Sequence, residues 1–297
     1  MTLIQIKVFL SVVETGSFSK AGDLLGMSQP AISHAISGLE AEVGVTLLNR
    51  SRNGITLTEI GEQILPHMRE MMRYQECVYQ EVDAYKGLTK GTVRIGSFPS
   101  ISASWMPGII HTFQQAYPAI QLILAEGTYE EIEDWIQSGH IHVGFVTLPV
   151  THLDVIPLIR DELAAILPAT HPLGVEASVP IEKIVTSPFI MPNAGCQTLI
   201  KQAFTDANIT PDIRYELRET STILQMVESN VGISILPNLA LASRHSSVLV
   251  KPTTPVIYRE IGLAVRSLKL TAPAVQAFIQ HVQQWIADSA DSPSSCK

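Results

Sequence analysis

The chain has 297 residues, of which 46% are hydrophobic and 16% are charged, and its formal net charge is −8. This length predicts two or three domains with cores of their own. The acidic balance argues against a protein that holds nucleic acid through a generally basic surface. The sequence has no run of about eighteen apolar residues and no apolar signal segment, so we expect a cytoplasmic protein with no membrane partner.

Two helices joined by a short connection are predicted at the start of the chain. The first is indicated by apolar residues at helical spacing, namely Leu3, Ile6, Phe9, Leu10 and Val13. Either Ser17 or Ser19 caps the second helix, and Gly26 can take the left-handed conformation that ends it. Ala21 and Gly22 present almost no side chain, which allows a third helix to cross the second one closely.

The third helix has one apolar and one polar face. Ser28 caps it, and Pro30 stands in its first turn, where a missing amide hydrogen costs nothing. The residues expected to pack inward are Ile32, Ala35, Ile36, Leu39 and Val43, and those expected to point outward are Gln29, Ser33, His34 and Ser37. Such an outer face could read a DNA major groove.

A long motif extends from this helix into the next segment. It comprises the run Ser-Gln-Pro-Ala-Ile-Ser at 28–33, then Leu39, Glu40, Gly44, Leu47, Leu48, Arg50, Arg52, Leu57, Thr58 and Gly61. It resembles the amino-terminal signature of LysR-type transcriptional regulators. Any small three-helix unit has close crossings and polar faces, but a match continuous over about sixty residues is far more specific than a lone short motif.

The resemblance implies a winged helix-turn-helix domain at residues 1–58 that binds double-stranded operator or promoter DNA. The residues we assign to DNA contact are Ser17, Ser28, Gln29, Pro30, Ser33, His34, Ser37, Arg50 and Arg52. Gln29 could pair with an adenine edge, while Arg50 and Arg52 lie on the predicted wing, where they could reach phosphates or the minor groove.

The DNA face departs from the family pattern at several positions. His34 and Ser37 stand where many members carry long basic or amide side chains, and Leu48 replaces a usual Phe. The charged residues of the first sixty positions are Lys7, Lys20, Arg50 and Arg52 against Glu14, Asp23, Glu40, Glu42 and Glu59. Attraction to phosphate is therefore weak, and we expect firm binding to depend on two or more copies acting together.

Residues 59–88 are predicted to form a long linker and dimerisation helix. Its heptad seam consists of Ile64, Met68, Met71, Gln75, Val78, Val82 and Tyr85. Pro66 should bend the helix near its start. The seam favours a homodimer through this helix over a helix packed on its own domain. The family resemblance also implies a dimer, and we expect dimers to pair into a homotetramer on an operator with dyad-related half-sites.

From residue 89 to 297, apolar strands alternate with helical segments, which predicts α/β layers and an α+β multidomain chain overall. This region resembles the regulatory part of the same family, which is built like a type II periplasmic binding protein. The resemblance implies two α/β lobes joined by two crossing strands. We place lobe 1 at about 91–162 and 267–290, and lobe 2 at about 163–266, with crossings near 161–163 and 265–267.

The resemblance also implies a small-molecule effector, a metabolite, bound between the lobes. The residues we assign to it are Ser100, Ile101, Ser102, Thr128, Thr147, Gly195, Cys196 and Gln197. Ser and Thr at strand ends also cap helices without any ligand, so each residue alone is equally well explained by capping. No Arg or Lys is evident in these loops, so helix ends and hydroxyls should handle any carboxylate.

Cysteines and histidines raise two further alternatives. Cys196 could sense oxidants in its loop, but a small residue lining a pocket is the favoured reading because no second cysteine lies nearby. Cys77 and Cys296 are distant, and three spaced cysteines suit a reducing compartment. His140 and His142 share a face of a predicted strand, yet no third metal ligand is evident, so neither metal nor cofactor is expected.

The sequence indicates a ligand-responsive transcriptional regulator that is not an enzyme and has no catalytic residues. Its promoter binding would be modulated by the effector, and RNA polymerase is a possible partner. One alternative is a hydrolase-like α/β enzyme fused to a DNA-binding head, but the nucleophile elbow, phosphate-binding loop and zinc-protease motifs are absent from the sequence. The other alternative is a redox-responsive regulator acting through Cys196.

Overall fold

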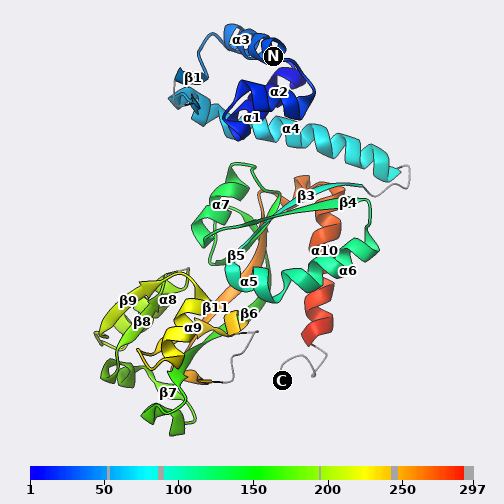
Figure 1. Ribbon diagram of the computed structural model, residues 1–297. Coiled ribbons are helices and arrows are strands. Elements are labelled where there is room, and N and C mark those ends of the chain that lie inside the picture. The colour runs from blue at the N-terminus through cyan, green and yellow to red at the C-terminus, as the bar shows by residue number, and fades with distance from the viewer. Residues whose placement is uncertain (52–53, 86–89, 194, 242–246, 291–297) are drawn as a thin grey trace.

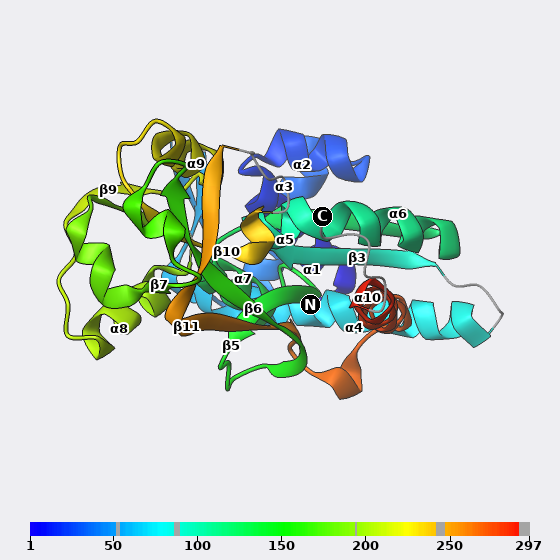
Figure 2. The same ribbon diagram turned by 90° about the horizontal axis from the view of Figure 1, so that it is seen from below.

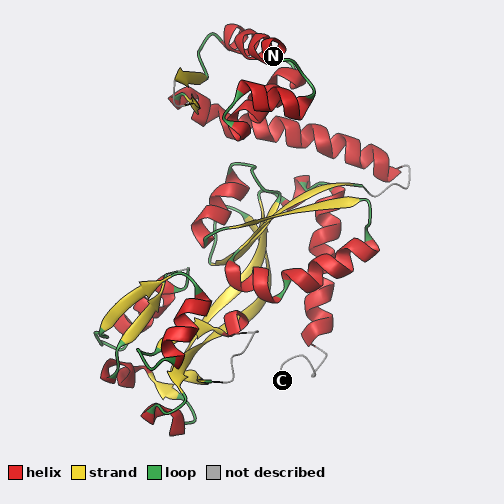
Figure 3. Cartoon of the chain, in the orientation of Figure 1, coloured by secondary structure: helices red, strands yellow, loops and turns green. Residues whose placement is uncertain are grey.

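The computed structural model describes residues 1–51, 54–85, 90–193, 195–241 and 247–290. Figure 1 shows a head formed by the first residues, a long helix below it, and two lobes beneath that helix. The head is almost entirely helical, whereas most strands lie in the two lobes (Figure 3). Within the described residues, no helix is long and apolar enough to cross a membrane.

The head contains three helices and a two-stranded hairpin. The helices are α1 (Leu3–Thr15), α2 (Phe18–Leu25) and α3 (Gln29–Val43), and the strands β1 (Leu48–Ser51) and β2 (Gly54–Leu57) pair antiparallel. Phe9, Ile32 and Leu39 are fully buried between the helices. A Cβ at Gly22 would lie 2.6 Å from the carbonyl oxygen of Met27, which explains the need for glycine where α2 turns toward α3.

The predicted helix-turn-helix is present, with one error in its packing. Gly26 adopts a left-handed φ of 65° and ends α2, as its position in the sequence suggested. Val43 was expected to pack inward, but its side chain is 38% exposed. It is the last residue of α3, directly before the left-handed Gly44, so it lies beyond the head core.

The linker helix α4 (Glu59–Tyr85) follows the wing and contains Pro66. Its start belongs to the head, because Met68 is buried in the head core with Ile64 packed beside it. Further along, one side of α4 contacts lobe 1 through buried Cys77. The head therefore covers Ile64 and Met68, the first two members of the predicted seam. The later apolar members are uncovered within the single chain: Val78 is 60% exposed, and Met71, Val82 and Tyr85 are exposed too.

Lobe 1 is built on three neighbouring strands. Strands β3 (Gly91–Ser97), β4 (Ile120–Glu126) and β5 (Val143–Leu148) are parallel, with β3 in the middle. Around them lie the helices α5 (Pro99–Ser104), α6 (Met106–Ala116), α7 (Tyr129–Gln137) and α10 (Pro273–Ala290). Because α10 contributes Phe278 and Val282 to the core, the carboxyl-terminal helix completes lobe 1, as expected.

Lobe 2 uses shorter elements. Strands β8 (Phe189–Pro192) and β9 (Ile213–Leu217) pair parallel, β10 (Ser234–Pro237) joins the main sheet, and α8 (Gln197–Asp206) and α9 (Thr220–Glu228) flank the strands. The remaining elements are the 3-10 helices η1 (Pro172–Val175), η2 (Ile181–Thr186) and η3 (Asn238–Leu241) and the short strand β7 (Val179–Pro180), with η4 (Leu268–Leu270) after the return to lobe 1. Lobe 2 has two apolar clusters, around Phe189 and around Ile223.

Two long antiparallel strands cross between the lobes, β6 (Asp154–Pro168) and β11 (Val248–Val265). Figure 2 shows them from below as the connection between the lobes. Ile257 and Leu163 belong to a lobe 2 cluster, whereas Ile261 and Val265 belong to the lobe 1 core. The predicted crossing at 161–163 falls within β6. That at 265–267 is wrong, because β11 already pairs with β5 from Glu260 onward.

Candidate functional site

The amino-terminal part of α3 presents the polar face that the sequence predicted. The Ser28 hydroxyl accepts a hydrogen bond from the Ala31 amide at 3.4 Å, and Pro30 occupies the first turn. Gln29, His34 and Ser37 are exposed. Ser33, which is half-buried, lies one turn after Gln29 and one turn before Ser37. These side chains therefore lie along one side of α3.

The start of α2 and the wing border this side. Ser17 caps α2 by accepting a hydrogen bond from the Lys20 amide at 3.4 Å. The Gln29 side-chain oxygen accepts a hydrogen bond from the Ser19 hydroxyl at 3.4 Å, which positions the amide. The Arg50 guanidinium stacks 4.7 Å above the Phe18 ring. Arg52, the other predicted wing cation, lies outside the described residues.

One acidic residue of the head has a structural role. Glu40 on α3 accepts hydrogen bonds from the amides of Leu47 and Leu48 at 2.8 and 3.2 Å. It thereby fixes the start of the wing against α3, which explains an acidic residue in the DNA-binding motif. Leu48 is buried in the head core, so its substitution for the family's usual Phe affects packing and not the exposed face.

A cleft of about 740 Å³ lies between the lobes. Lobe 1 contributes Ser100, Ser102 and Thr128 to its wall, in agreement with the residues singled out in the sequence. The opposite wall comes from the loop before α9 and the start of that helix, 218–221, which carries no motif that indicated a binding site. Nothing distinguished the Arg-Glu-Thr-Ser run from an ordinary helix start until the fold placed it across from α5 and α7.

One of the hydroxyl residues in this wall, Thr128, also has a structural role as a helix cap. The Thr128 hydroxyl accepts a hydrogen bond from the Glu131 amide at 3.2 Å, and the Glu131 carboxylate accepts one from the Thr128 amide at 2.7 Å. This capping box starts α7. The Ser102 hydroxyl, by contrast, is buried with no hydrogen-bond partner among the described residues.

Other residues assigned to the effector lie elsewhere. Ile101 is fully buried in the lobe 1 core, so its assignment to the cleft wall is wrong. Gln197 is half-buried on α8 and donates a hydrogen bond to Glu216 at 3.2 Å. It is absent from the described lining of the cleft. Gly195 packs against the Tyr129 ring, where an added Cβ would come within 2.6 Å of a ring carbon.

The loops assigned to the effector contain no Arg or Lys, but Arg218 lines the cleft from lobe 2 and a buried arginine, Arg259, stands behind it. Arg259 donates to Asp161 from Nε at 2.9 Å and from Nη2 at 2.6 Å, and to Ser100 at 2.8 Å. It also donates to the Tyr129 hydroxyl at 2.5 Å and stacks over Phe98 at 5.0 Å. Because Arg259 lies on a crossing strand, this cluster joins lobe 1 to the hinge.

Cys196 lies near this cluster as a buried thiol. Its side chain is 4% exposed, and burial raises the pKa of the thiol more strongly than the Arg259 charge lowers it. Burial likewise raises the pKa of Tyr129, with Arg259 and Thr147 acting in the opposite direction. Thr147 therefore lies close to the cluster, although it does not line the cleft. Both Cys196 and Tyr129 are neutral at physiological pH.

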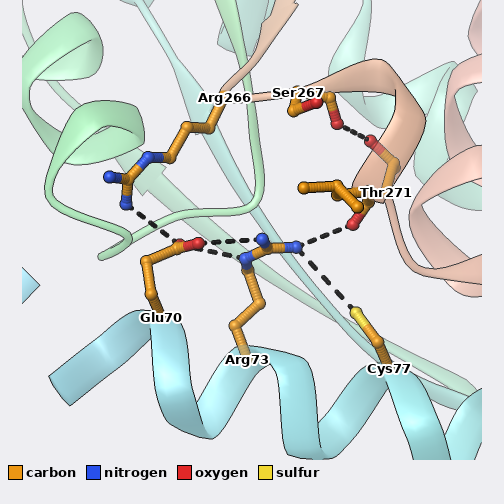
Figure 4. Close-up of polar contacts among 7 residues, drawn as sticks. Glu70, Arg73, Cys77, Arg266, Ser267 and Thr271 are labelled. Atoms are coloured by element: carbon orange, nitrogen blue, oxygen red, sulfur yellow. Dashed lines mark hydrogen bonds and ion pairs between the residues drawn. The ribbon is translucent and has the colours of Figure 1, made fainter. Parts of the chain in front are cut away.

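A second polar cluster joins α4 to lobe 1 (Figure 4). Arg73 donates to both Glu70 oxygens at 2.9 and 2.8 Å and to the Leu270 carbonyl at 2.8 Å. Glu70 also pairs with Arg266 at 3.2 Å, and Arg266 directly follows β11. Two turns further along α4, buried Gln80 accepts a hydrogen bond from the Ala274 amide at 3.2 Å. The linker helix is therefore bonded to the chain that leaves the hinge.

The two histidines do not form the predicted pair on a strand. His140 and His142 precede β5, which begins at Val143, so the prediction that they share a strand face is wrong. His142 Nδ1 accepts a hydrogen bond from the Arg94 amide at 3.2 Å. Burial and the charges of Arg94 and Arg73 lower the pKa of His142 to about 4. Among the described residues, no cluster of three potential metal ligands occurs.

Comparison with known proteins identifies both halves of the chain. Residues 3–62 match the family described as bacterial regulatory helix-turn-helix protein, lysR family, and residues 86–287 match the LysR substrate binding domain. The chain is 37% identical over 287 residues to the uncharacterized regulator YvbU of Bacillus subtilis, covering 96% of this chain and 98% of YvbU. It is 34% identical to the probable regulator LrrA of Synechococcus elongatus, covering 96% and 97% of the two chains.

Solved structures show the same fold. A full-length OxyR variant from Pseudomonas aeruginosa aligns with a TM-score of 0.81 at 23% identity, covering 96% of this chain and 94% of OxyR. CbnR, solved in complex with its target DNA, aligns with a TM-score of 0.64 at 22% identity, covering 96% and 100% of the two chains. The chain therefore belongs to the LysR family of transcriptional regulators, with a helix-turn-helix domain followed by a LysR substrate-binding domain.

Proposed function

We propose that this regulator binds operator DNA as a dimer, and that a small-molecule effector in the interlobe cleft changes how the two heads engage that DNA. The observation that carries the proposal is the cleft itself. Ser100 and Thr128 of lobe 1 and residues 218–221 of lobe 2 line a volume of about 740 Å³. This volume suits a metabolite of ordinary size.

The hinge provides a route from the cleft to the DNA-binding head. Ser100 in the cleft wall bonds to Arg259 on β11. The same strand ends at Val265, and the next residue, Arg266, pairs with Glu70 of the linker helix. A change in the angle between the lobes would therefore displace α4, and with it the head.

The linker seam supports the dimer. Met71, Val78 and Val82 are exposed in the single chain, although they follow the heptad spacing of a helix pair. Such a row of apolar side chains on a helix is usually covered by a partner. A second copy would place two α3 helices against two half-sites. Pairing of dimers into a tetramer and contact with RNA polymerase would follow on the promoter.

For the DNA contacts, we propose Gln29 as the base-reading residue of α3 and Arg50 as the wing cation. The surrounding Ser17, Ser28, Pro30, Ser33, His34 and Ser37 would position the helix or contact phosphates. Arg52 is retained in this proposal on the strength of its sequence position alone. The exposed, uncharged character of the face supports selective and weak binding by a single head.

We also infer that the chain acts without enzymatic chemistry, in the cytoplasm. The polar groups behind the cleft bind one another: Asp161 holds Arg259, and Arg259 holds Tyr129. The pKa of the Cys196 thiol is raised by burial, which disfavours the thiolate that oxidants attack. Treatment with hydrogen peroxide, followed by mass spectrometry, tests the redox alternative. Oxidation of Cys196 at stoichiometric peroxide, accompanied by altered operator binding, would revive it.

The effector proposal is tested by a thermal-shift screen of metabolites on the full chain. A metabolite that raises the unfolding temperature of the wild type should lose most of this effect in Ser100→Ala. It should retain the effect in Gln29→Ala, which alters the DNA face. A stabilising metabolite that acts equally on the wild type and Ser100→Ala would place the effector outside this cleft.

A further inference from the structure

A second groove, of about 520 Å³, lies where the head, the linker helix and lobe 1 meet. Figure 1 shows α4 running between the head, which contains α1, and lobe 1, which contains β3. The groove is lined by Lys7 from α1, Arg69 and Arg73 from α4, and Arg94 from β3. Arg73 is paired with Glu70, which leaves Lys7, Arg69 and Arg94. In the described part of the chain, none of these three forms an ion pair. In a protein with a net charge of −8, three cations without an ion-pair partner at one groove are unusual.

The cations influence one another and their neighbours. Burial has the largest effect on the pKa of Arg69 and lowers it. The charge of Glu14 raises this pKa, and the charge of Arg94 lowers it. Burial lowers the pKa of His140, and the charges of Arg69 and Arg94 lower it further. Two carboxylates, Glu14 and Glu76, also line the groove, and that of Glu76 accepts a hydrogen bond from Gln80 at 3.1 Å. Positive charge thus exceeds negative charge at the groove.

An unpartnered hydroxyl marks the wall of the same groove. Ser11 on α1 is 4% exposed, and its hydroxyl has no hydrogen-bond partner among the described residues. It lines the groove together with the three cations. A buried hydroxyl without a partner costs free energy, which a ligand atom at hydrogen-bonding distance would recover.

We propose that this groove binds a small, multiply charged anion bearing phosphate or carboxylate groups. Guanidinium groups match the oxygens of both anions through paired hydrogen bonds, and Lys7 adds a third positive charge. The site shares no lining residue with the interlobe cleft. It shares one residue, Gln75, with the linker seam.

Such an anion would contact three units of the chain at once. Lys7 belongs to the DNA-binding head, Arg69 to the linker helix and Arg94 to lobe 1. An anion between them would hold the head in this arrangement against lobe 1. The groove would then act as a second input to DNA binding, separate from the effector cleft.

Isothermal titration of the full chain with inorganic pyrophosphate tests the proposal, and citrate in a second arm distinguishes phosphate from carboxylate recognition. We expect at least one probe to bind the wild type. Arg94→Gln should weaken that binding about tenfold, because one charge-assisted contact is lost. Arg94 is exposed, so this substitution should leave the fold intact, and Arg69→Gln provides a second variant should the first unfold.

Arg214→Gln is the matched control, since it removes an exposed arginine charge from lobe 2, far along the chain from the groove. It should bind the probe as the wild type does, and so should the cleft variant Ser100→Ala. Failure of both probes to bind the wild type would overturn the proposal. Equal binding by the wild type, Arg94→Gln and Arg69→Gln would overturn it as well. A loss of binding in Ser100→Ala alone would assign the anion to the interlobe cleft instead.

Discussion

Asp161 and Arg259 face each other on the two strands that cross between the lobes, and their side chains form a 2.6 Å ion pair that is at most 2% exposed. The pair lies where the apolar core of one lobe gives way to that of the other. Through Ser100 and Tyr129, Arg259 also contacts the lobe 1 side of the cleft. The hinge and the cleft thus share one buried hydrogen-bonded cluster.

Asp161→Asn should destabilise the protein strongly, because it leaves the Arg259 charge buried without a counter-charge. We expect the free energy of unfolding to fall by about 3 kcal/mol, as for other buried pairs that lose one partner. Urea denaturation followed by circular dichroism measures this change. Asp212→Asn breaks an exposed pair with Arg214 and should cost less than about 1 kcal/mol. Equal effects of the two substitutions would contradict this account of the hinge.

At Thr128, two substitutions separate helix capping from ligand binding. Thr128→Val removes the hydroxyl that caps α7 and should lower the free energy of unfolding by about 1 kcal/mol. It should also reduce the effector-induced thermal shift. Thr128→Ser keeps the hydroxyl and should retain both properties. If the valine variant responds to the effector as fully as the serine variant, the Thr128 side chain has no part in binding.

Gln29→Ala should weaken operator binding about tenfold or more, because a bidentate contact with an adenine edge is lost. Fluorescence anisotropy with operator and scrambled duplexes measures the change, and the loss should be larger for the operator. Gln202→Ala provides the control, because Gln202 is an exposed residue of α8 in lobe 2. An equal loss on both duplexes would reassign Gln29 from base reading to phosphate contact.

The head and the exposed apolar row of the linker helix could be predicted from the sequence because their signals are local. Caps at Ser17 and Ser28 and a left-handed Gly26 act within one or two turns, and a heptad spacing is visible without knowing any partner. Val43 was misplaced because helical periodicity does not reveal where a core ends.

The cleft was predicted in part, because its walls combine residues far apart in the chain. Ser100 and Thr128 could be found at strand ends. Arg259 was missed because it lies inside a long strand. A charged residue in a strand is expected to be solvent-exposed, and the sequence does not show that Asp161 lies opposite it. The 218–221 wall likewise depends on the packing of lobe 2 across from lobe 1. Contacts of this kind follow from topology, which local patterns do not encode.

Val78→Glu should convert the dimer into a monomer, because it places a charge in the apolar seam of both copies. Sedimentation analysis of the full chain measures the mass. Tyr74→Glu, at an exposed position of α4 outside the predicted seam, is the control and should leave the dimer intact. A Val78→Glu protein that remains dimeric would show that the copies associate elsewhere.

His142 should make stability depend on pH. Its folded pKa of about 4 lies below that of an unfolded histidine, so the unfolded chain binds the proton more readily. Stability is therefore highest above about pH 6.5, where His142 is neutral in both states. As the pH falls toward 4, the free energy of unfolding should drop by about 3 kcal/mol because of this one group. Denaturation of the wild type and His142→Asn between these pH values isolates it, with His111→Asn as control. If the free energies of unfolding of the wild type and His142→Asn differ by the same amount at every pH, this prediction is contradicted.

The central claim is that an effector between the lobes changes how the heads engage DNA. Its most direct test is the nuclease footprint and bend angle on an operator selected from genomic DNA, measured with and without a stabilising metabolite. We predict that the metabolite alters both for the wild type and leaves both unchanged for Thr128→Val. A saturating metabolite that stabilises the wild type through this cleft, yet changes neither its footprint nor its bend, would contradict the account.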